Sequence, residues 1–322
     1  MAGAEHAQPT RLTDVVSTAK KRLPPSFFDY LRRMRRVFPP PLVMLAAAAL
    51  SAAPQEPLGP AAVPGLMTRV GERVEQYYAR ARSIVCEEAV RLEPLQSNLQ
   101  PDGSHVRHLV YELRVSWDAP TEGTRPPEAS VLRQLVSIDG RPPRAGDEPG
   151  CMDPKPVSTE PLAMLLSGRQ REFAFTWRDT GRTAGRPSVT LDYKSLTPKP
   201  PDVTWAGSCV SIDLPGRTRG RVWVDRNTAE VLRLDEQLTG WVEIPAPRQQ
   251  MRAGSAMAFV VERADSSIRY RPIAFHDPDE IVMLPESIES VQLIRNVGVP
   301  GLRKVQRFSN YKRFITAGRV VE

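Results

Sequence analysis

The amino-acid sequence predicts a mainly β (α+β) protein. Its core is expected to be one large curved antiparallel sheet, or half-barrel, of about a dozen strands with one N-terminal helix and one short inserted helix. The clearest signal is residues 219–239, where two alternating runs of apolar and polar residues flank a polar Asp-Arg-Asn-Thr turn, as in an antiparallel hairpin. Similar short runs follow one another from residue 83 to residue 314, without the alternating strands and helices of a nucleotide-binding fold. The 32 prolines, about twice the usual share, indicate many loops and strand ends.

An amphipathic helix is expected at the start of the folded part, over residues 65–82. Apolar residues recur at helical spacing along this stretch, at Leu66, Val70, Val74, Tyr77 and Ala81. A curved antiparallel sheet needs a cover for its apolar face, because that face cannot be left in water. We therefore expect this helix to fill the inside of the curl.

The remaining strands are expected at short intervals, bounded by Gly, Pro, Asn and Asp. Besides the hairpin, they span residues 83–93, 106–117, 131–138, 172–177, 188–196, 209–214, 256–263, 267–275, 281–284, 287–296 and 302–314. The short inserted helix is expected over residues 159–166, where Thr159 suits the N-cap position and Pro161 lies in the first turn.

Residues 1–53 have the composition of a leader. The segment 41–53, PLVMLAAAALSAA, suits the apolar core of a secretory signal and is short for a bilayer span of about 20 residues. A conventional signal peptide would begin at Met34 and be cleaved after Ser51. The alternative is a long basic arm with an uncleaved anchor. We predict export, to the periplasm, the outer face of the envelope or the medium.

The leader also carries most of the net charge of +7, because residues 1–53 contain eight basic and three acidic side chains. Nucleic-acid-binding domains concentrate basic residues on the folded body, so no nucleic-acid partner is expected. No stable transmembrane span is expected once the signal is removed. Beyond the leader we expect a Pro/Ala linker over residues 54–64, a single curved β-sheet domain over residues 65–318 and a tail over residues 319–322.

Three cysteines allow one disulfide, which an exported protein can keep. Cys151 lies in a Gly/Pro-rich loop and Cys209 opens a short strand, so both stand at loop margins where a bridge is easily formed. Cys86 follows an apolar run and has the pattern of a buried small hydrophobic residue. We predict a Cys151–Cys209 disulfide.

One short segment resembles a metal or catalytic cluster. It contains His276, Asp277, Asp279 and Glu280, but the spacing matches no common zinc or calcium site, and an exposed turn explains it as well. The usual nucleophile, phosphate-binding and zinc-protease motifs do not occur in the sequence, so no cofactor and no catalytic residue are predicted.

Four tryptophans in the predicted strands are candidates for the lining of an apolar groove. They are Trp117, Trp177, Trp223 and Trp241. The other interpretation is structural, since aromatic side chains commonly anchor a core or cover the rim of a sheet.

The hairpin sequence resembles that of periplasmic lipoprotein-sorting (lipoprotein-carrier-like) proteins. Its pattern R-V-W-V-D-x-x-T-x-x-V-L-R-L-D lies within residues 216–239. Together with RFSNYKRF at residues 307–314 and LPES at residues 284–287, it resembles more closely a family of uncharacterised exported bacterial proteins, over residues 65–318. The resemblance implies a half-barrel sheet around helices and no known reaction. It carries over no ligand-contact residue, because the carrier proteins bind through a diffuse apolar cavity.

These observations predict a non-enzymatic exported protein that binds an apolar or amphipathic ligand, such as a lipid, or a partner in the cell envelope. Two alternatives remain at this stage. One is a hydrolase with a site around His276 and Asp277. The other is a structural envelope-interaction module with a filled interior and an exposed apolar edge.

The leader and the disulfide can be tested by one intact-mass measurement on protein purified from its own compartment. We expect a chain that begins at Ala52 and is lighter by two protons than the reduced chain, because the bridge removes both thiol protons. A retained leader, or a mass equal to that of the reduced chain, would contradict the respective prediction.

Overall fold

The computed structural model describes residues 59–313, except residues 82, 118–128, 148–161, 207–208, 246–257, 277 and 296–300. The chain divides into two compact units, residues 1–55 and 56–322, and the described residues belong to the second. The predicted leader, the start at Met34, the cleavage after Ser51 and the tail over residues 319–322 therefore lie outside the described residues, as do residues 54–58 of the predicted linker.

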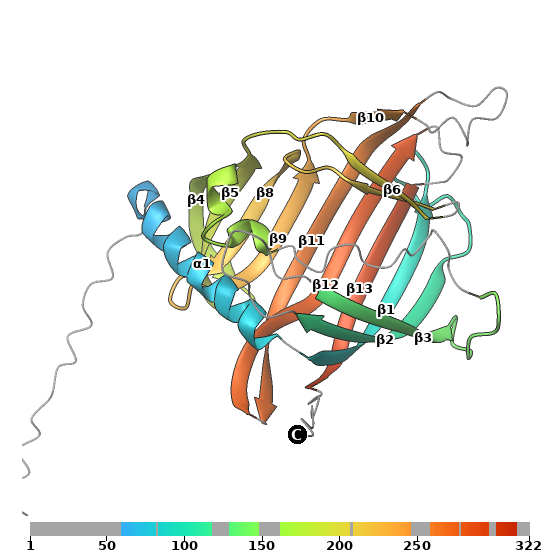
Figure 1. Ribbon diagram of the computed structural model, residues 1–322, viewed down its shortest axis with the longest axis horizontal. Coiled ribbons are helices and arrows are strands. Elements are labelled where there is room, and N and C mark those ends of the chain that lie inside the picture. Colours follow the sequence, from blue (N-terminus) through green and yellow to red (C-terminus); the bar gives the residue numbers. More distant parts are fainter. Residues whose placement is uncertain are drawn as a thin grey trace, which may run out of the picture. The chain divides into compact units, whose positions relative to one another are not determined.

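The predicted large antiparallel sheet is confirmed. Eleven strands form one sheet in the order β3-β2-β1-β13-β12-β11-β9-β8-β5-β4, with β10 paired to β11 (Figure 1). The strands are β1 (Ile84–Leu95), β2 (Arg107–Trp117), β3 (Ala129–Ile138), β4 (Phe173–Thr183), β5 (Arg186–Ser195), β8 (Thr218–Asp225), β9 (Val231–Leu238), β10 (Val242–Pro245), β11 (Ala258–His276), β12 (Asp279–Arg295) and β13 (Gly301–Arg313). The predicted hairpin is the β8–β9 pair.

Two pairs of predicted strands are each one long strand. The segments 256–263 and 267–275 join as β11, and 281–284 and 287–296 join as β12. The residues between the first pair are polar and look like a turn, but β9 and β12 pair with them on both sides. A strand end was expected at Pro285, but β12 continues through it. Pro285 pairs with Tyr270, next to a register shift between Arg269 and Tyr270, and such an irregularity accommodates a proline within a strand.

Two further strands form a small separate ribbon that the sequence analysis in part missed. Strand β6 (Asp202–Ala206) pairs with β7 (Cys209–Asp213), of which only β7 was expected. Val203 and Ile212 pack on a second apolar cluster formed by β9, β10 and β11, which includes Val242 and Phe259. The ribbon therefore serves as cover for that cluster.

The main core lies between the first helix and the inner face of the sheet (Figure 1). Helix α1 (Val63–Arg80) follows a 3-10 turn, η1 (Pro60–Ala62), so it starts two residues before the predicted Gly65. Its buried stripe includes Leu66, Val70 and Val74, which confirms the expectation that the helix covers the sheet. Within the described part of the chain, no helix is long and apolar enough to cross a bilayer.

The described part of the predicted inserted helix contains one 3-10 turn, η3 (Ala163–Leu165), and a second 3-10 turn, η4 (Gln170–Glu172), follows beyond the predicted range. Residues 159–161 of the predicted helix lie outside the described residues. The side-chain amide of Gln170 donates to the backbone carbonyl groups of Met67 and Leu165, both at 2.8 Å. This insertion therefore holds α1 by a hydrogen bond to the helix backbone.

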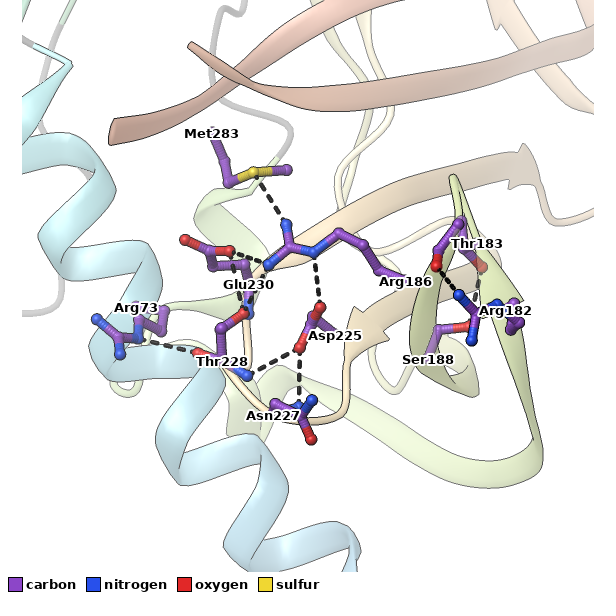
Figure 2. A network of polar contacts seen from close by, with 11 residues as sticks. Arg73, Arg182, Thr183, Arg186, Ser188, Asp225, Asn227, Thr228, Glu230 and Met283 are labelled. Atoms are coloured by element: carbon purple, nitrogen blue, oxygen red, sulfur yellow. Dashed lines mark hydrogen bonds and ion pairs between the residues drawn. The ribbon is translucent and has the colours of Figure 1, made fainter. Parts of the chain in front are cut away.

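A polar network holds the β8–β9 turn, strand β5 and α1 together (Figure 2). The carboxylate of Asp225 accepts the backbone N–H groups of Asn227 and Thr228 at 2.8 and 2.9 Å, which shapes the turn. Arg186 on β5 pairs with Asp225 at 2.8 Å and with Glu230 at 2.7 Å. Arg73 on α1 donates to the Thr228 carbonyl oxygen at 2.9 Å.

We expect Arg186→Met to destabilise the protein by up to about 3 kcal/mol, because it leaves the buried Asp225 carboxylate without its cation. The Asp225 side chain is only 3% exposed, whereas Arg186 is 29% exposed, which places the effect at the lower end for buried pairs. Urea denaturation measures this loss. The control is Arg178→Met, because Arg178 pairs with Asp192 at the surface, where such pairs contribute about 0–1 kcal/mol. Equal losses in both variants would contradict the prediction.

Candidate functional site

A cavity of about 390 Å³ lies between the C-terminal end of α1 and the inner face of the sheet. The lining residues come from α1 and the residue after it, from five strands of the inner face and β2, and from the segment before η3. They are Tyr77, Tyr78 and Ala81; Ile84, Cys86 and Glu88 of β1; Leu113 and Val115 of β2; Glu236 of β9; Ser266, Ile268 and Tyr270 of β11; Leu284, Pro285, Ile288 and Ser290 of β12; Lys304, Gln306, Phe308 and Tyr311 of β13; and Leu162. The lining is mainly apolar with a few polar groups, the composition typical of small-molecule sites.

The strand register explains why these side chains face one space. Residues directly opposite each other on antiparallel strands point to the same side of a sheet, and residues two apart along a strand do so too. Ile268 is paired with both Leu234 and Ile288, and Ile288 is paired with Gln306. One apolar row thus crosses β9, β11 and β12 on the inner face, and it ends at the polar Gln306 on β13.

A second row, two residues along the strands, is polar. Ser266 is paired with Glu236 on one side and with Ser290 on the other, and Ser290 is paired with Lys304. All four side chains line the cavity. We call Glu236, Ser266, Ser290 and Lys304 the polar row. The cavity wall therefore changes from apolar to polar along the direction of the strands.

The Glu236 carboxyl at one end of this row has an unusual setting. The hydroxyl of Tyr193 donates to it at 3.2 Å from β5, two strands away. The strand between them has Gly220 at the paired position, where a Cβ atom would collide with the Asp235 carbonyl oxygen and lie 2.8 Å from the Tyr193 hydroxyl. The missing side chain thus lets the tyrosine cross β8. Burial raises the pKa of Glu236 above its ordinary value, against the hydrogen bonds from Tyr193 and Thr218, which lower it.

A buried ion pair forms another part of the wall. Arg133 of β3 binds Glu88 of β1 through two hydrogen bonds of 2.7 and 3.0 Å, and the Gln306 amide donates to the same carboxylate at 2.6 Å. Both charged side chains are nearly inaccessible, 4% and 1% exposed, and Arg133 lies 3.7 Å above the ring centre of Tyr111. Because each charge is satisfied inside the protein, this group stiffens the wall.

Tyr270 differs from these groups. Its side chain is buried, it lines the cavity, and its hydroxyl has no hydrogen-bond partner among the described residues. Burial raises the pKa of this phenol well above its ordinary value, so it remains a hydrogen-bond donor. An unsatisfied buried hydroxyl costs about 1–3 kcal/mol. A polar atom of a bound molecule could remove that cost.

The cluster around His276 is an exposed turn in the structure. His276 ends β11 and Asp279 begins β12; their side chains are 94% and 88% exposed, and Nδ1 of His276 lies 3.6 Å from a carboxylate oxygen of Asp279. Glu280 faces away from this pair and forms an ion pair with Arg313, and Asp277 lies outside the described residues. No group of three or more potential metal ligands occurs within residues that the structure describes.

The described tryptophans do not line the cavity. Trp177 packs at the edge of the main core from β4, and Trp223 lies on the outer face between Arg221 and Arg233, whose guanidinium carbons are 5.5 and 4.7 Å from its ring centre. Trp241 is 64% exposed. For Trp117 the structure describes only the backbone, at the end of β2. An apolar groove formed by these residues therefore does not coincide with the cavity.

Of the cysteines, Cys86 is buried as the sequence indicates, and its side chain lines the cavity. Burial, and to a lesser degree the Glu88 carboxylate, raises the pKa of its thiol to about 12. Cys151 lies outside the described residues, and for Cys209 only the backbone, in β7, is described. The Cys151–Cys209 disulfide stays a prediction.

Sequence reasoning missed the polar groups of the cavity, although a signal for them exists. In β9, Leu232, Leu234 and Leu238 alternate as an inward face, and Glu236 occupies the remaining inward position. A charged residue within an apolar alternation is the mark of a polar group placed inside. Glu88, between Cys86 and Val90, shows the same pattern.

No family model matches the chain, and no curated protein matches it in sequence. Among solved structures, it is similar to a LolA superfamily protein from Nitrosomonas europaea at 10% identity, covering 77% of this chain and 94% of that one, with a TM-score of 0.32. A DUF1329 family protein from Desulfovibrio piger matches at 9% identity, covering 79% and 94% of the two chains, with a TM-score of 0.37.

An outer-membrane lipoprotein-sorting protein domain from Vibrio parahaemolyticus also matches, at 10% identity over 80% of this chain and 95% of that one, with a TM-score of 0.31. These are proteins of the kind that the hairpin sequence resembles. The likeness is one of fold.

The raised pKa of Glu236 predicts how stability depends on pH. Between the unfolded and the folded pKa values, the folded protein holds more protons than the unfolded chain, so this carboxyl makes stability fall as pH rises. The Glu236→Gln variant has no carboxyl at this position, so this fall in stability with rising pH is absent from it. We expect the difference in unfolding free energy, variant minus wild type, to increase from about pH 4 to about pH 8 in urea denaturation.

The control for this prediction is Glu243→Gln, because Glu243 is an exposed carboxyl on β10. Its difference from wild type should stay flat over the same interval. If the difference in unfolding free energy between Glu236→Gln and wild type is also independent of pH, the Glu236 carboxyl does not make stability fall as pH rises.

Proposed function

We propose that this protein is an exported, non-enzymatic binding protein that holds an apolar or amphipathic ligand in the cavity between α1 and the inner face of the sheet. The observation that carries the proposal is the cavity itself: a partly open space of about 390 Å³ beside the main core that is packed around α1. A space of this size is within the roughly 300–1,000 Å³ typical of small-molecule sites.

The chemistry of the wall favours binding. Most of the wall is aliphatic or aromatic, including Ile268, Ile288 and Phe308, so it gains free energy when it covers an apolar surface. The buried ion pair of Glu88 and Arg133 is internally satisfied. The Tyr270 hydroxyl provides one polar contact for a ligand atom.

Transport or storage of such a ligand suits a protein outside the cytoplasm, where apolar molecules must cross water between membranes. The secretory pattern of residues 41–53 supports that location. A lipid or another apolar molecule of the cell envelope is therefore the proposed ligand, bound by shape and burial without chemical change.

The test is uptake of the uncharged fluorescent dye Nile red by the mature protein and by two serine variants of β12. Ser290→Phe places a ring in the cavity, whereas Ser287→Phe places the same ring on the outer face, because Ser287 is paired with the exposed Arg269 and Arg307. We expect wild type and Ser287→Phe to bind the dye, and Ser290→Phe to bind it at least about tenfold more weakly.

Far-ultraviolet circular dichroism of both variants checks that each is folded. Absence of dye binding by the wild type, or equal binding by the two folded variants, would contradict the proposal. Native mass spectrometry of protein from its own compartment would then identify the mass of any ligand that copurifies.

A further inference from the structure

The wall of the cavity is split between β12 and β13, beside the end of α1. We infer that a ligand enters and leaves the cavity through this split, and that side-chain contacts centred on Arg313 hold it closed between exchanges. This inference rests on the proposed binding function and adds to it the route of the ligand.

The strand register shows where the split begins. Strands β12 and β13 are paired over residues 287–292 and 302–307. Past that point β13 continues to Arg313 along β1, whereas β12 reaches back to Asp279 along β11. Figure 1 shows the hairpin of β11 and β12, in orange, turning away from the last part of β13, in red. Over this stretch of the described chain, no backbone ladder joins β12 to β13.

Both edges of the split line the cavity. One edge carries Leu284 and Pro285 of β12, and the other carries Phe308 and Tyr311 of β13. These side chains are largely apolar, so an apolar molecule that passes between them exchanges one apolar surface for another. The split is therefore a path from the surface to the cavity that suits the proposed class of ligand.

The end of β13 is held to its surroundings by one arginine. The Arg313 guanidinium forms an ion pair with Glu280 of β12 and lies 4.8 Å from the ring centre of Phe275 on β11. It also donates to the backbone carbonyl oxygen of Arg80, at the end of α1, at 2.7 Å. Both side chains of the ion pair are mostly buried, 18% and 19% exposed. Arg313 thus connects β13 to β12, β11 and α1 across the split.

Two hydrogen bonds cross the split nearer to the cavity. The Tyr311 hydroxyl donates to the Pro285 carbonyl oxygen at 2.5 Å, and Arg271 of β11 donates to the Phe308 carbonyl oxygen at 3.4 Å. Side chains change rotamer without any loss of strand pairing, so contacts of this kind can open and close while the sheet stays intact. The split is therefore closed by contacts that can be released locally.

The ion pair is the contact to remove in a test, because neither Arg313 nor Glu280 lines the cavity. A split that opens more often speeds entry and exit by the same factor and leaves the dissociation constant unchanged. We expect Glu280→Gln to raise both rates of Nile red exchange about fivefold in stopped-flow fluorescence, the factor that corresponds to about 1 kcal/mol for the lost ion pair.

The matched control is Glu289→Gln. Glu289 of β12 lies 3.7 Å from Arg303 of β13, but between the paired parts of the same two strands. Its removal leaves the ladder in place, so both exchange rates should equal those of the wild type. Circular dichroism checks that the variants are folded. Arg313→Met, which removes the ion pair from the other side, repeats the test if Glu280→Gln does not fold.

A cross-link across the split should have the opposite effect. In the double variant Glu280→Cys/Arg313→Cys, the short linker bismaleimidoethane can join the two new thiols, and peptide mass spectrometry confirms the linked positions. We expect cross-linking to lower both exchange rates at least about tenfold, because a tethered split can no longer open. The same linker in Glu289→Cys/Arg303→Cys should leave both rates unchanged.

The outcomes separate this inference from the proposed function. If the wild type takes up no dye, the binding function itself fails. If the dye binds, but Glu280→Gln and the cross-linked protein exchange it at the wild-type rates, the cavity binds ligands and the route through the split is wrong. If Glu289→Gln speeds exchange as much as Glu280→Gln, the effect does not come from the split, and the route is wrong as well.

Discussion

The contact between the apolar stripe of α1 and the inner face of the sheet is the interaction on which the rest of the structure depends. The inner face of β5, β8 and β9 is mainly apolar, and Val189, Leu191, Val222 and Leu234 are buried there in one core cluster with the helix. Each such side chain contributes about 1.5–3 kcal/mol when it leaves water. Arg73 and the Asp225 turn then set the place of α1 along that face, because they join the helix to the hairpin by directed polar contacts.

The cavity is a consequence of where this helix ends. Helix α1 stops at Arg80, while β11, β12 and β13 continue beyond it with inward side chains. The inner face therefore has a packed part under the helix and an open part past its end. The packed core and the cavity occupy two regions of one sheet face, so the main core can hold the fold without closing the cavity.

Two kinds of polar group occupy the wall, and their roles differ. Arg133 of β3 extends across β2 to Glu88 on β1, and these two opposite charges neutralise each other. The polar row is different, since it faces the open space along four consecutive strands. Tyr193 can contact Glu236 at the end of this row because Gly220 leaves its path free. One glycine thereby shapes the electrostatics of the site without touching it.

Local patterns were enough to predict the class of fold, the covering helix and most of the strands. Period-two alternation, as in the β8–β9 hairpin, and the helical spacing of Leu66, Val70 and Val74 are short-range properties that a sequence carries directly. The break between β11 segments was predicted wrongly, because Ser266 and Ser267 look like a turn until neighbouring strands supply their hydrogen bonds. Strand β6 was missed because its partner and its apolar cover are supplied by tertiary contacts.

The site required the tertiary structure. The four residues of the polar row are spread from position 236 to position 304, and only the strand order and register bring them into one line. The sequence instead drew attention to His276 and Asp279, which are close along the chain and fully in solvent. By itself, the sequence determined which residues alternate and which face of each strand is apolar, since these depend on neighbours along the chain. Only the tertiary structure decided which strands lie side by side and where α1 ends, because pairing and packing join residues far apart in the chain, and those two facts create the cavity.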